Sequence, residues 1–382
     1  MENRKKLIKA STVPGSLETF CKGQLRWLSN YYEVVAVSSP LSELALIERR
    51  EGVRTVAVPM ERHISLSRDM KSLFRMIAVF RREKPYIVHS MTPKAGLICM
   101  IAAWICRVPV RIHTYTGLVF PTASGLRRKI LILTDRILCL CATYINPEGR
   151  GVANDLWKYR ITRKPLHIIG NGNVRGIDLD YWNAELFEDR RPAMRGQLGI
   201  GSSDFVFLFV GRLVRDKGIN ELVEAFGRLS SEYSQVRLLL VGAYESELDP
   251  LETETLKEIE SNPRIIAPGS KQDVRPYYAS SDLFVFPSYR EGFPNTVLEA
   301  GAMGLPCIAT DINGCNEIIT EGENGILVPP HDVAALYGAM KRFLDNPECA
   351  KGLAAGARAL VANRFEQQYL WNELLKTYMA LI

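Results

Sequence analysis

The sequence contains no Cys-x-x-Cys pair, no low-complexity segment and no internal repeat of short period. The lack of a repeat argues against a solenoid or propeller architecture. Most of the eight cysteines lie in apolar runs, as at Cys99, Cys106, Cys139 and Cys141. Such surroundings are typical of reduced cysteines in a protein core, so we expect a cytoplasmic protein.

The sequence also has no hydrophobic run long enough to span a bilayer. The longest, LICMIAAWIC at residues 97–106, is well short of a membrane helix. Asp135 and Arg136 interrupt a second run at residues 130–145. We interpret both runs as buried helices of an α/β domain. No apolar stretch follows the basic residues near the N-terminus, so we also expect no secretory signal peptide.

Charge is distributed unevenly along the chain. The 382 residues carry a net charge of +6. Residues 1–180 contain 29 Lys and Arg against 14 Asp and Glu, whereas the remaining 202 contain 19 against 28. A basic first half indicates an anionic partner, and nucleic acid, a membrane surface and a phosphorylated acceptor are the candidates. The length predicts two domains, because a single hydrophobic core rarely grows so large.

Short apolar runs alternate with amphipathic stretches throughout the chain. The first half contains the predicted strands LIKAST, VVAVSS, VRTVAVP, YIVHSM, VRIHTYTG and ATYINP, with a helix near 17–30. The second half contains the predicted strands FVFLFVGRL, VRLLLVG, RIIAPGS, DLFVFPS, PCIATDI and GILVPP, with a helix near 217–232. This alternation is typical of parallel sheets covered by helices on both faces. The predicted fold class is therefore α/β, with two doubly wound, Rossmann-like domains.

A polar stretch after residue 177 is the expected domain boundary. We assign residues 1–178 to the first domain and 179–365 to the second, and we expect the final helix at 366–382 to pack back on the first domain. Open parallel sheets bind ligands beyond the carboxyl ends of their strands. With two such domains, a cleft between them is the expected site.

Two motifs admit ligand-binding interpretations that their contexts do not favour. GNGNVRG at 170–176 follows the predicted strand LHII and has nearly the spacing of a dinucleotide-binding loop. No helix start follows it, so a glycine-rich crossover between domains is the better interpretation. Asp178 and Asp180 form a D-x-D pair of a kind that holds metal ions in some enzymes. The pair lies on the linker, which favours a plain surface position.

VGRLVRDKG at residues 210–218 is more informative. Gly211 ends a predicted strand, Arg212 follows it, and Lys217 is expected to begin the next helix. A glycine at a strand end lets a ligand approach the backbone. Arg212 through a forked contact and Lys217 as a point charge could both reach one diphosphate. A solvated basic loop explains this stretch, taken alone, equally well.

YREGFPNTVLE at residues 289–299 resolves that ambiguity. The stretch follows a predicted strand, and Pro294 is expected as the first residue of a helix. Glu291 lies on the loop, and Glu299 lies roughly 7–8 Å along the helix axis from Pro294. The first N–H groups of such a helix start are expected to form an anion site, and here they belong to Gly292, Phe293, Asn295 and Thr296. Carboxylates on opposite sides of an anion suit the hydroxyl groups at the two ends of a nucleotide-sugar better than shared proton chemistry.

These two loops carry a resemblance to a known family. EGFPNTVLE and GRLVRDKG resemble motifs of the retaining glycosyltransferases of family 4, in which two glutamates are separated by seven residues, as Glu291 and Glu299 are. The resemblance covers nearly the whole chain, including HSMTPKAG and RIHTYTGLVF in the first half. It implies the GT-B fold, in which two Rossmann-like domains face a central cleft.

The resemblance also implies residue roles. The glutamate that matches Glu299 holds the ribose hydroxyls, and the one that matches Glu291 contacts the donor sugar. Pro268 and Gly269 lie where the nucleobase is usually bound. Catalytic roles are implied for Glu291, His113, Arg212 and Lys217. The remaining implied donor-binding residues are Gly15, Ser16, Gly211, Gly292, Phe293, Asn295 and Thr296.

His113 departs from the family pattern. Many relatives place a histidine directly before the glycine, whereas here Thr116 precedes Gly117. A histidine within a strand is otherwise a common hydrogen-bonded core residue, and that alternative stays open. No metal or cofactor is expected, because cations and a helix start stabilise the leaving diphosphate. The family retains the anomeric configuration, and no carboxylate is an obvious nucleophile, so we expect attack on the same face.

The implied reaction transfers a hexose-type sugar from a nucleotide-sugar, UDP-linked by family frequency, to a polyprenyl-diphosphate-linked glycan in capsule, O-antigen or similar assembly. The basic first half would then meet the inner face of the cell membrane through Arg127-Arg128-Lys129 and residues 62–84. We therefore expect a peripheral membrane enzyme. A sugar-nucleotide epimerase or phosphorylase of the same architecture is one alternative. A nucleic-acid-binding protein is another, which the scarcity of aromatic residues among the basic ones disfavours.

Overall fold

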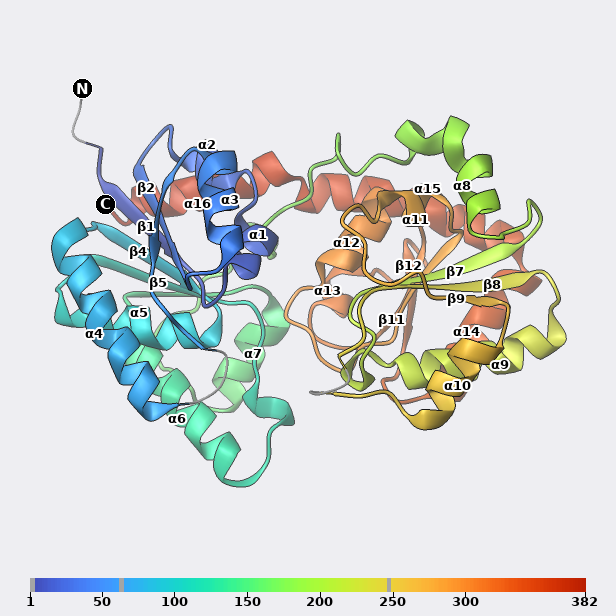
Figure 1. Cartoon of the computed structure of the whole chain (residues 1–382), viewed down its shortest axis with the longest axis horizontal. Coiled ribbons are helices and arrows are strands. Elements are labelled where there is room, and N and C mark those ends of the chain that lie inside the picture. The colour runs from blue at the N-terminus through green and yellow to red at the C-terminus, as the bar shows by residue number, and fades with distance from the viewer. Residues whose placement is uncertain (1–3, 62–64, 246–248) are drawn as a thin grey trace. The chain divides into compact units, whose positions relative to one another are not determined.

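The computed structural model describes residues 4–61, 65–245 and 249–382, and it divides into two compact units. Unit 1 comprises Met1–Gly176 and Gln368–Ile382, and unit 2 comprises Ile177–Gln367. Each unit is built on a six-stranded sheet. Figure 1 shows helices packed around both sheets. Unit 1 thus takes its last helix from residues that follow all of unit 2.

The sheet of unit 1 is entirely parallel and has the strand order β3-β2-β1-β4-β5-β6. Its strands are buried on both faces, which explains their nearly continuous apolar sequences. They span Lys6–Ala10 (β1), Glu33–Ser38 (β2), Arg54–Ala57 (β3), Ile87–Met91 (β4), Val110–Tyr115 (β5) and Tyr144–Pro147 (β6).

Helices cover both faces of this sheet. They are α1 (Pro14–Cys21), α2 (Gln24–Leu28), α3 (Ser42–Glu51), α4 (Leu66–Glu83), α5 (Pro93–Ile105), α6 (Gly125–Cys141), α7 (Arg150–Lys158) and α16 (Gln367–Ala380), with a 3-10 turn at Phe120–Thr122. One hydrophobic cluster joins the sheet to α4, α5, α6 and α7. A separate cluster joins the other face to α1, α2, α3 and α16.

Three sequence predictions for unit 1 were wrong in detail. The helix near 17–30 is two helices, because Gly23 has a positive φ of 76° between them. The predicted strand LHII is reduced to a single bridge at Leu166. The run at 130–145 falls mainly on α6, which is not a buried helix, since only Leu138 and Cys139 are fully buried in it.

A buried polar network links α16 to the sheet of unit 1. The Lys9 ammonium donates to Gln24 Oε1 (2.9 Å), and its pKa is lowered by burial. His89 Nδ1 is hydrogen-bonded to the Tyr378 hydroxyl of α16 (2.5 Å), and His89 Nε2 to Thr114 Oγ1 (2.7 Å). Buried polar groups must satisfy one another in this way, because an unpaired one costs several kcal/mol.

The sheet of unit 2 has the order β12-β11-β10-β7-β8-β9, which is the order of unit 1 counted from the opposite edge. Its strands, also parallel, span Phe205–Val210 (β7), Val236–Val241 (β8), Ile265–Ile266 (β9), Leu283–Phe286 (β10), Cys307–Thr310 (β11) and Gly325–Val328 (β12). The predicted α/β class with two parallel sheets is therefore confirmed.

The helices of unit 2 share one hydrophobic cluster with the sheet. They are α8 (Arg191–Gln197), α9 (Ile219–Glu232), α10 (Thr253–Ser261), α11 (Arg275–Ala279), α12 (Asn295–Ala302), α13 (Cys315–Ile318), α14 (Val333–Asp345) and α15 (Pro347–Phe365), with 3-10 turns at Ala184–Arg190 and Arg215–Lys217. Lys217 ends a 3-10 turn and does not begin α9, because Gly218 intervenes with a φ of 69°. Within the described residues, no helix is both long enough and apolar enough to cross a bilayer.

Candidate functional site

The strand order of unit 2 reverses between β10 and β7, and the loops after these two strands lie side by side. Open parallel sheets bind ligands beyond the strand ends at such a reversal. The Tyr289 amide donates to the Asp216 carbonyl (3.0 Å), and the Ser288 hydroxyl oxygen lies 3.3 Å from the same carbonyl oxygen. The two loops singled out in the sequence are thus joined by hydrogen bonds.

Lys217 and Glu291 form an ion pair across these loops. Their side chains are 16% and 15% exposed, so the pair is shielded but remains in contact with solvent. The Ser288 hydroxyl donates to the same Glu291 oxygen (2.8 Å) and holds the carboxylate in place. An ammonium group has three N–H donors, so Lys217 can bind an added anion while it keeps Glu291.

Arg212 has a different partner. Its Nη1 lies 2.5 Å from Glu245 Oε2, and its side chain is half exposed. Exposed ion pairs contribute little free energy. Arg212 can therefore exchange Glu245 for another anion at small cost.

The ends of β7 and β8 pack closely because residue 242 is glycine. A Cβ atom there would lie 1.7 Å from the Gly211 carbonyl oxygen.

The start of α12 lies at the same edge. Pro294 is the N-cap and Asn295 the first helical residue, so the predicted start was one residue too early. Asn295 and Thr296 occupy the positive end of the helix dipole. Glu299 is largely buried, and the buried Tyr278 hydroxyl lies 3.4 Å from Glu299 Oε2 and 3.2 Å from the Thr296 carbonyl. Sequence reasoning missed Tyr278, which lies some 20 residues upstream on α11.

Phe293 anchors the loop before α12. Its ring is buried and packs on Phe365, with the centroids 5.4 Å apart. The backbone of Gly292 and Phe293 is therefore the part able to bind a ligand. Gly314 has a φ of 79°, and a Cβ atom there would lie 2.4 Å from the Gly292 carbonyl oxygen. Sequence reasoning also missed Gly314, although its position four residues after β11 was a signal.

A cluster of charged and aromatic residues holds the other side of this loop. The Tyr289 hydroxyl is bonded to Glu221, and burial together with Glu221 raises the pKa of Tyr289. The Tyr289 ring lies 3.6 Å from the His331 ring between centroids. Arg290 Nη2 lies 3.0 Å from Asp216 Oδ2. Tyr289, Arg290 and Asp216 lie in the two loops that the sequence indicated, whereas Glu221 and His331 belonged to no recognisable motif.

Pro268 and Gly269 follow β9 at the margin of the sheet, on the carboxyl side of the strand. Gly269 has a φ of 78°, and a Cβ atom there would meet nothing within 4 Å. The backbone at this loop therefore borders open space.

Two other predicted donor-binding residues lie in unit 1. Gly15 and Ser16 occupy the first turn of α1, directly after β1. A Cβ atom at Gly15 would also meet nothing within 4 Å. Gly15 and Ser16 therefore lie at a helix start at the carboxyl ends of the strands.

His113 lies in the core of unit 1. It is 1% exposed, and its Nδ1 lies 2.9 Å from the Ser90 hydroxyl. A Cβ atom at Gly96 would lie 2.4 Å from His113 Cε1, so α5 packs directly on the ring. Burial lowers the pKa of His113 to about 3. These surroundings favour the core interpretation, because a ligand could contact the ring only if α5 moved.

The two disfavoured motifs also have structural explanations. No helix begins within residues 170–176, and a Cβ atom at Gly170 would lie 2.7 Å from Leu370 of α16. Close packing on α16 thus requires glycine there. Asp178 Oδ1 accepts hydrogen bonds from the amides of Asp180 (3.1 Å) and Tyr181 (3.0 Å), which is a turn-capping role.

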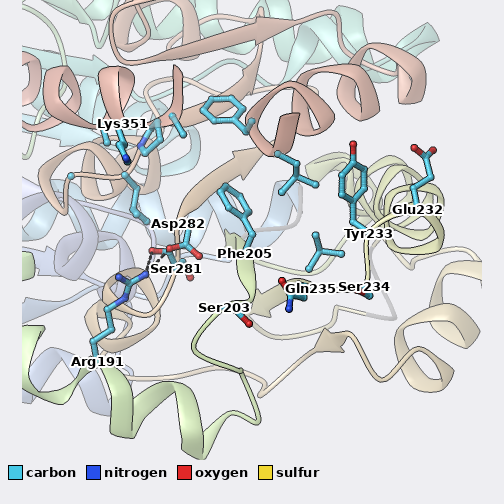
Figure 2. Close-up of a pocket in the computed structure, with 18 residues that line it drawn as sticks. Arg191, Ser203, Phe205, Glu232, Tyr233, Ser234, Gln235, Ser281, Asp282 and Lys351 are labelled. Carbon is cyan, nitrogen blue, oxygen red and sulfur yellow. Dashed lines mark hydrogen bonds and ion pairs between the residues drawn. The ribbon is translucent and has the colours of Figure 1, made fainter. Parts of the chain in front are cut away.

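A cavity of about 800 Å³ lies at the amino-terminal ends of the strands of unit 2, opposite the candidate site (Figure 2). Its lining includes Phe205 and Val236, the first residues of β7 and β8. Arg191 and Asp282 form an ion pair there (2.6 Å). Among the described residues that line the cavity, none belongs to the predicted site. The cavity and the candidate site are therefore separated by the length of the strands.

Two protein-family models match the chain. The model described as "Glycosyl transferase 4-like domain" matches residues 17–172, and the model described as "Glycosyl transferases group 1" matches residues 204–346. The second match contains the loops after β7 and β10 and the start of α12.

Several known proteins are similar along most of their length. The capsular polysaccharide biosynthesis glycosyltransferase CapM of Staphylococcus aureus is 32% identical over 99% of this chain and 97% of its own. An Escherichia coli UDP-Gal:alpha-D-GlcNAc-diphosphoundecaprenol alpha-1,3-galactosyltransferase is 28% identical over 78% of this chain and 76% of its own. The crystal structure of Anabaena Alr3699/HepE in complex with UDP has a TM-score of 0.81 and 20% identity, and the match covers 98% of this chain and 100% of that one.

The structural likeness supports the GT-B fold, and the sequence identities extend over both units. The chain therefore belongs to the glycosyltransferases that combine a glycosyl transferase 4-like domain with a glycosyl transferases group 1 domain.

Proposed function

We propose that this glycosyltransferase moves a hexose-type sugar from a UDP-sugar to a glycan carried on polyprenyl diphosphate, with retention of the anomeric configuration. The observation that carries the proposal is the Lys217–Glu291 pair at the strand reversal of unit 2, beside the start of α12. The similar Anabaena protein was crystallised with UDP, and the name of the E. coli relative states a UDP-Gal donor and a diphosphoundecaprenol acceptor.

Lys217 and Arg212 are proposed to bind the donor diphosphate. Lys217 is poised beside Glu291, and Arg212 is held by an exposed pair with Glu245 that a diphosphate can replace. The first N–H groups of α12 add the positive end of a helix dipole. Together these groups offset the charge that develops on the leaving diphosphate, so we propose that no metal ion is needed.

The two glutamates are proposed to bind hydroxyl groups at the two ends of the donor. Glu299, oriented by Tyr278, accepts hydrogen bonds from the ribose. Glu291, oriented by Ser288 and Lys217, accepts them from the transferred sugar. A carboxylate that already has fixed partners loses little freedom when a hydroxyl group binds, which favours specificity.

The proposed step breaks the bond between the anomeric carbon and the diphosphate oxygen, while the acceptor oxygen forms its bond on the same face. The acceptor proton passes to the departing diphosphate. The position of the Glu291 oxygen beside Lys217 supports this route, because the ammonium neutralises the carboxylate and makes it a weak nucleophile. Proton NMR of the new glycosidic linkage in the product tests retention.

The donor assignment is tested by a thermal-shift screen of nucleotide-sugars and by calorimetry with UDP. We expect UDP to raise the melting temperature of wild-type protein and Glu299→Ala to weaken UDP binding. Glu254→Ala, an exposed change on α10, is the matched control and should bind UDP normally. Unchanged UDP affinity in the Glu299 variant would exclude the ribose role.

The acceptor is tested by mass spectrometry after incubation with the best donor and a short-chain polyprenyl-diphosphate sugar. A mass increase of one hexose supports transfer to a lipid-linked glycan. Conversion of the nucleotide-sugar into its epimer without an acceptor, read by NMR because epimers have equal masses, would instead support the epimerase alternative. Activity that persists in EDTA is expected, and its loss would overturn the metal-independent mechanism.

A further inference from the structure

Two charged pairs join the loops after β7 and β10, and their signs alternate. Asp216 and Lys217 are consecutive in the first loop, and Arg290 and Glu291 are consecutive in the second. Lys217 pairs with Glu291, whereas Asp216 Oδ2 lies 3.0 Å from Arg290 Nη2. An anion and a cation on one loop thus face a cation and an anion on the other. The proposed function uses the Lys217–Glu291 pair and leaves the second pair without a role.

Asp216 is fixed from several directions. Its carbonyl accepts the Tyr289 amide (3.0 Å), and its own amide donates to Asp249 Oδ2 (2.7 Å). The side chains of Asp216 and Arg290 are 29% and 34% exposed, so their pair is the more exposed of the two. Arg215, the cation before Asp216 in the sequence, is already paired with Asp249 Oδ1 (3.4 Å). The close cationic partner of the Asp216 carboxylate is therefore Arg290.

The alternation of signs excludes wrong partners. If Arg290 were absent, the Asp216 carboxylate would attract the neighbouring Lys217 ammonium, which two carboxylates would then share. If Asp216 were absent, the Arg290 guanidinium would compete with Lys217 for its carboxylate partner. Each charge of the second pair would thus disturb the first pair if it stood alone. Held together, the two charges offset one another and leave the first pair intact.

We propose that Asp216 and Arg290 are positioning residues, which hold the Lys217 ammonium beside its carboxylate partner without touching the donor. The inference rests on the proposed function, because the pair that they protect is the one proposed to act on the leaving diphosphate. The diphosphate gains charge only as it leaves, so a displaced ammonium should lower kcat more than it raises KM for the donor.

A double-mutant cycle tests this role. Asp216→Asn and Arg290→Gln each leave one uncompensated charge, whereas the double variant leaves none. We expect each single change to lower kcat about tenfold, within the range that a small misplacement near the reacting group causes. The double variant should recover to within about threefold of wild type, because it removes both competing charges together. Independent losses would instead multiply to about 100-fold.

The cycle also distinguishes two rival roles, and either rival pattern overturns the proposal. If Arg290 binds the diphosphate directly, the double variant will be as slow as Arg290→Gln, and Asp216→Asn will be close to wild type. If the pair only tethers the loops, the double variant will be as slow as the single ones, and the reversed pair Asp216→Arg/Arg290→Asp will be fully active. The reversed pair keeps the attraction but places like charges side by side, so we expect it to remain slow.

Glu224 and Arg228 provide a matched control in the same unit. They form an exposed ion pair on α9, away from the residues of the candidate site. Glu224→Gln, Arg228→Gln and their double variant should leave kcat unchanged. A comparable loss in these variants would contradict the assignment to the loop pair. Melting curves of all variants exclude unfolding as the cause of a loss.

A chemical readout tests the inference without sugar transfer. Acetic anhydride acetylates unprotonated amines, and mass spectrometry of peptides gives the rate at Lys217. Asp216→Asn removes a carboxylate that favours the protonated ammonium, so Lys217 should react faster, and Arg290→Gln should make it react more slowly. We expect changes of about twofold, the size that an exposed pair produces, and a rate close to wild type in the double variant. Unchanged rates in both single variants overturn the inference.

The two readouts separate this inference from the proposed function. If the wild-type protein transfers sugar but the cycle follows a rival pattern, the positioning role fails while the proposed function stands. If the wild-type protein transfers no sugar but the acetylation rates shift as expected, the proposed function fails while the control of Lys217 by its neighbours stands.

Discussion

The two units share one strand order but place their ionisable side chains in different parts of the fold. In unit 1, Lys9, His89 and His113 lie within strands and are buried. In unit 2, Lys217 and Glu291 lie in loops beyond the strand ends and keep contact with solvent. Parallel sheets covered on both faces exclude water from their strands, so polar groups there must bind one another.

The difference shows that topology supplies a ligand-binding edge but not its chemistry. Groups inside the strands of unit 1 stabilise a fixed arrangement, whereas groups past the strands of unit 2 can exchange partners with a ligand. Function is accordingly inferred from residues at the strand ends and not from the shared fold.

The largest expected effect tests whether the edge of unit 2 is the binding edge. Lys217→Ala removes the cation nearest the proposed leaving group, and we expect kcat to fall by about 10²–10³-fold, the usual cost of losing one electrostatic contact of the transition state. Steady-state kinetics measures it, with Lys257→Ala on α10 as the control. Full activity in Lys217→Ala would show that Lys217 does not act on the leaving group, and the contrast drawn between the two units would then be wrong.

The second effect compares two glycines with left-handed backbone. Gly52 and Gly218 have φ values of 66° and 69°, but only Gly218 lacks room, since a Cβ atom there would lie 2.1 Å from the Pro287 carbonyl oxygen. Alanine at residue 52 should cost about 1–2 kcal/mol of backbone strain. Alanine at residue 218 should cost about 1–3 kcal/mol more through overpacking. Urea unfolding of both variants measures these costs. Equal costs would show that the loops after β7 and β10 shift enough to make room for the added methyl group.

The third effect concerns acid. The pKa of His113 is lowered by burial to about 3 from its ordinary 6.5. Between these values the unfolded chain binds a proton that the folded chain does not, so the stabilisation is complete above pH 6.5 and is lost as the pH falls toward 3. At pH 5 this residue should therefore lower the free energy of unfolding of unit 1 by about 2 kcal/mol relative to neutral pH. Burial also lowers the pKa of His89, in the same direction.

Hydrogen exchange resolved by peptide measures this acid effect in each unit. Protection of β4 and β5 should fall between pH 7 and pH 5 before that of β7 and β10. A parallel loss in both units would contradict the assignment of this titration to unit 1.

The smallest effect sharpens the description of the unit 2 edge. Tyr278→Phe removes the hydroxyl beside Glu299 and should weaken UDP binding about fivefold, since a hydrogen bond contributes about 1 kcal/mol. kcat should change less than KM, because the ribose does not react. Tyr277→Phe is the neighbouring control. A larger fall in kcat than in affinity would mean that Tyr278 acts on the reacting sugar.

Local patterns in the sequence predicted the strands and the two loops of unit 2, because apolar runs and turn residues are local signals. They did not predict the contact between Lys217 and Glu291, or the hydrogen bond from Tyr278, because these depend on strand order. Ser288 was within reach of sequence reasoning, since it stands three residues before Glu291. The exposed side of α6 was misjudged because an apolar run does not reveal which of its residues the core uses.

The origin of unit 1 from two distant segments has a consequence for biosynthesis. Residues 368–382, which carry Tyr378, leave the ribosome after every residue of unit 2. The strands of unit 1 therefore leave the ribosome first. Lys9 and His89 cannot bond to the Tyr378 hydroxyl until all of unit 2 has been translated. A chaperone that binds nascent chains would meet unit 1 as the longer-lived incomplete species.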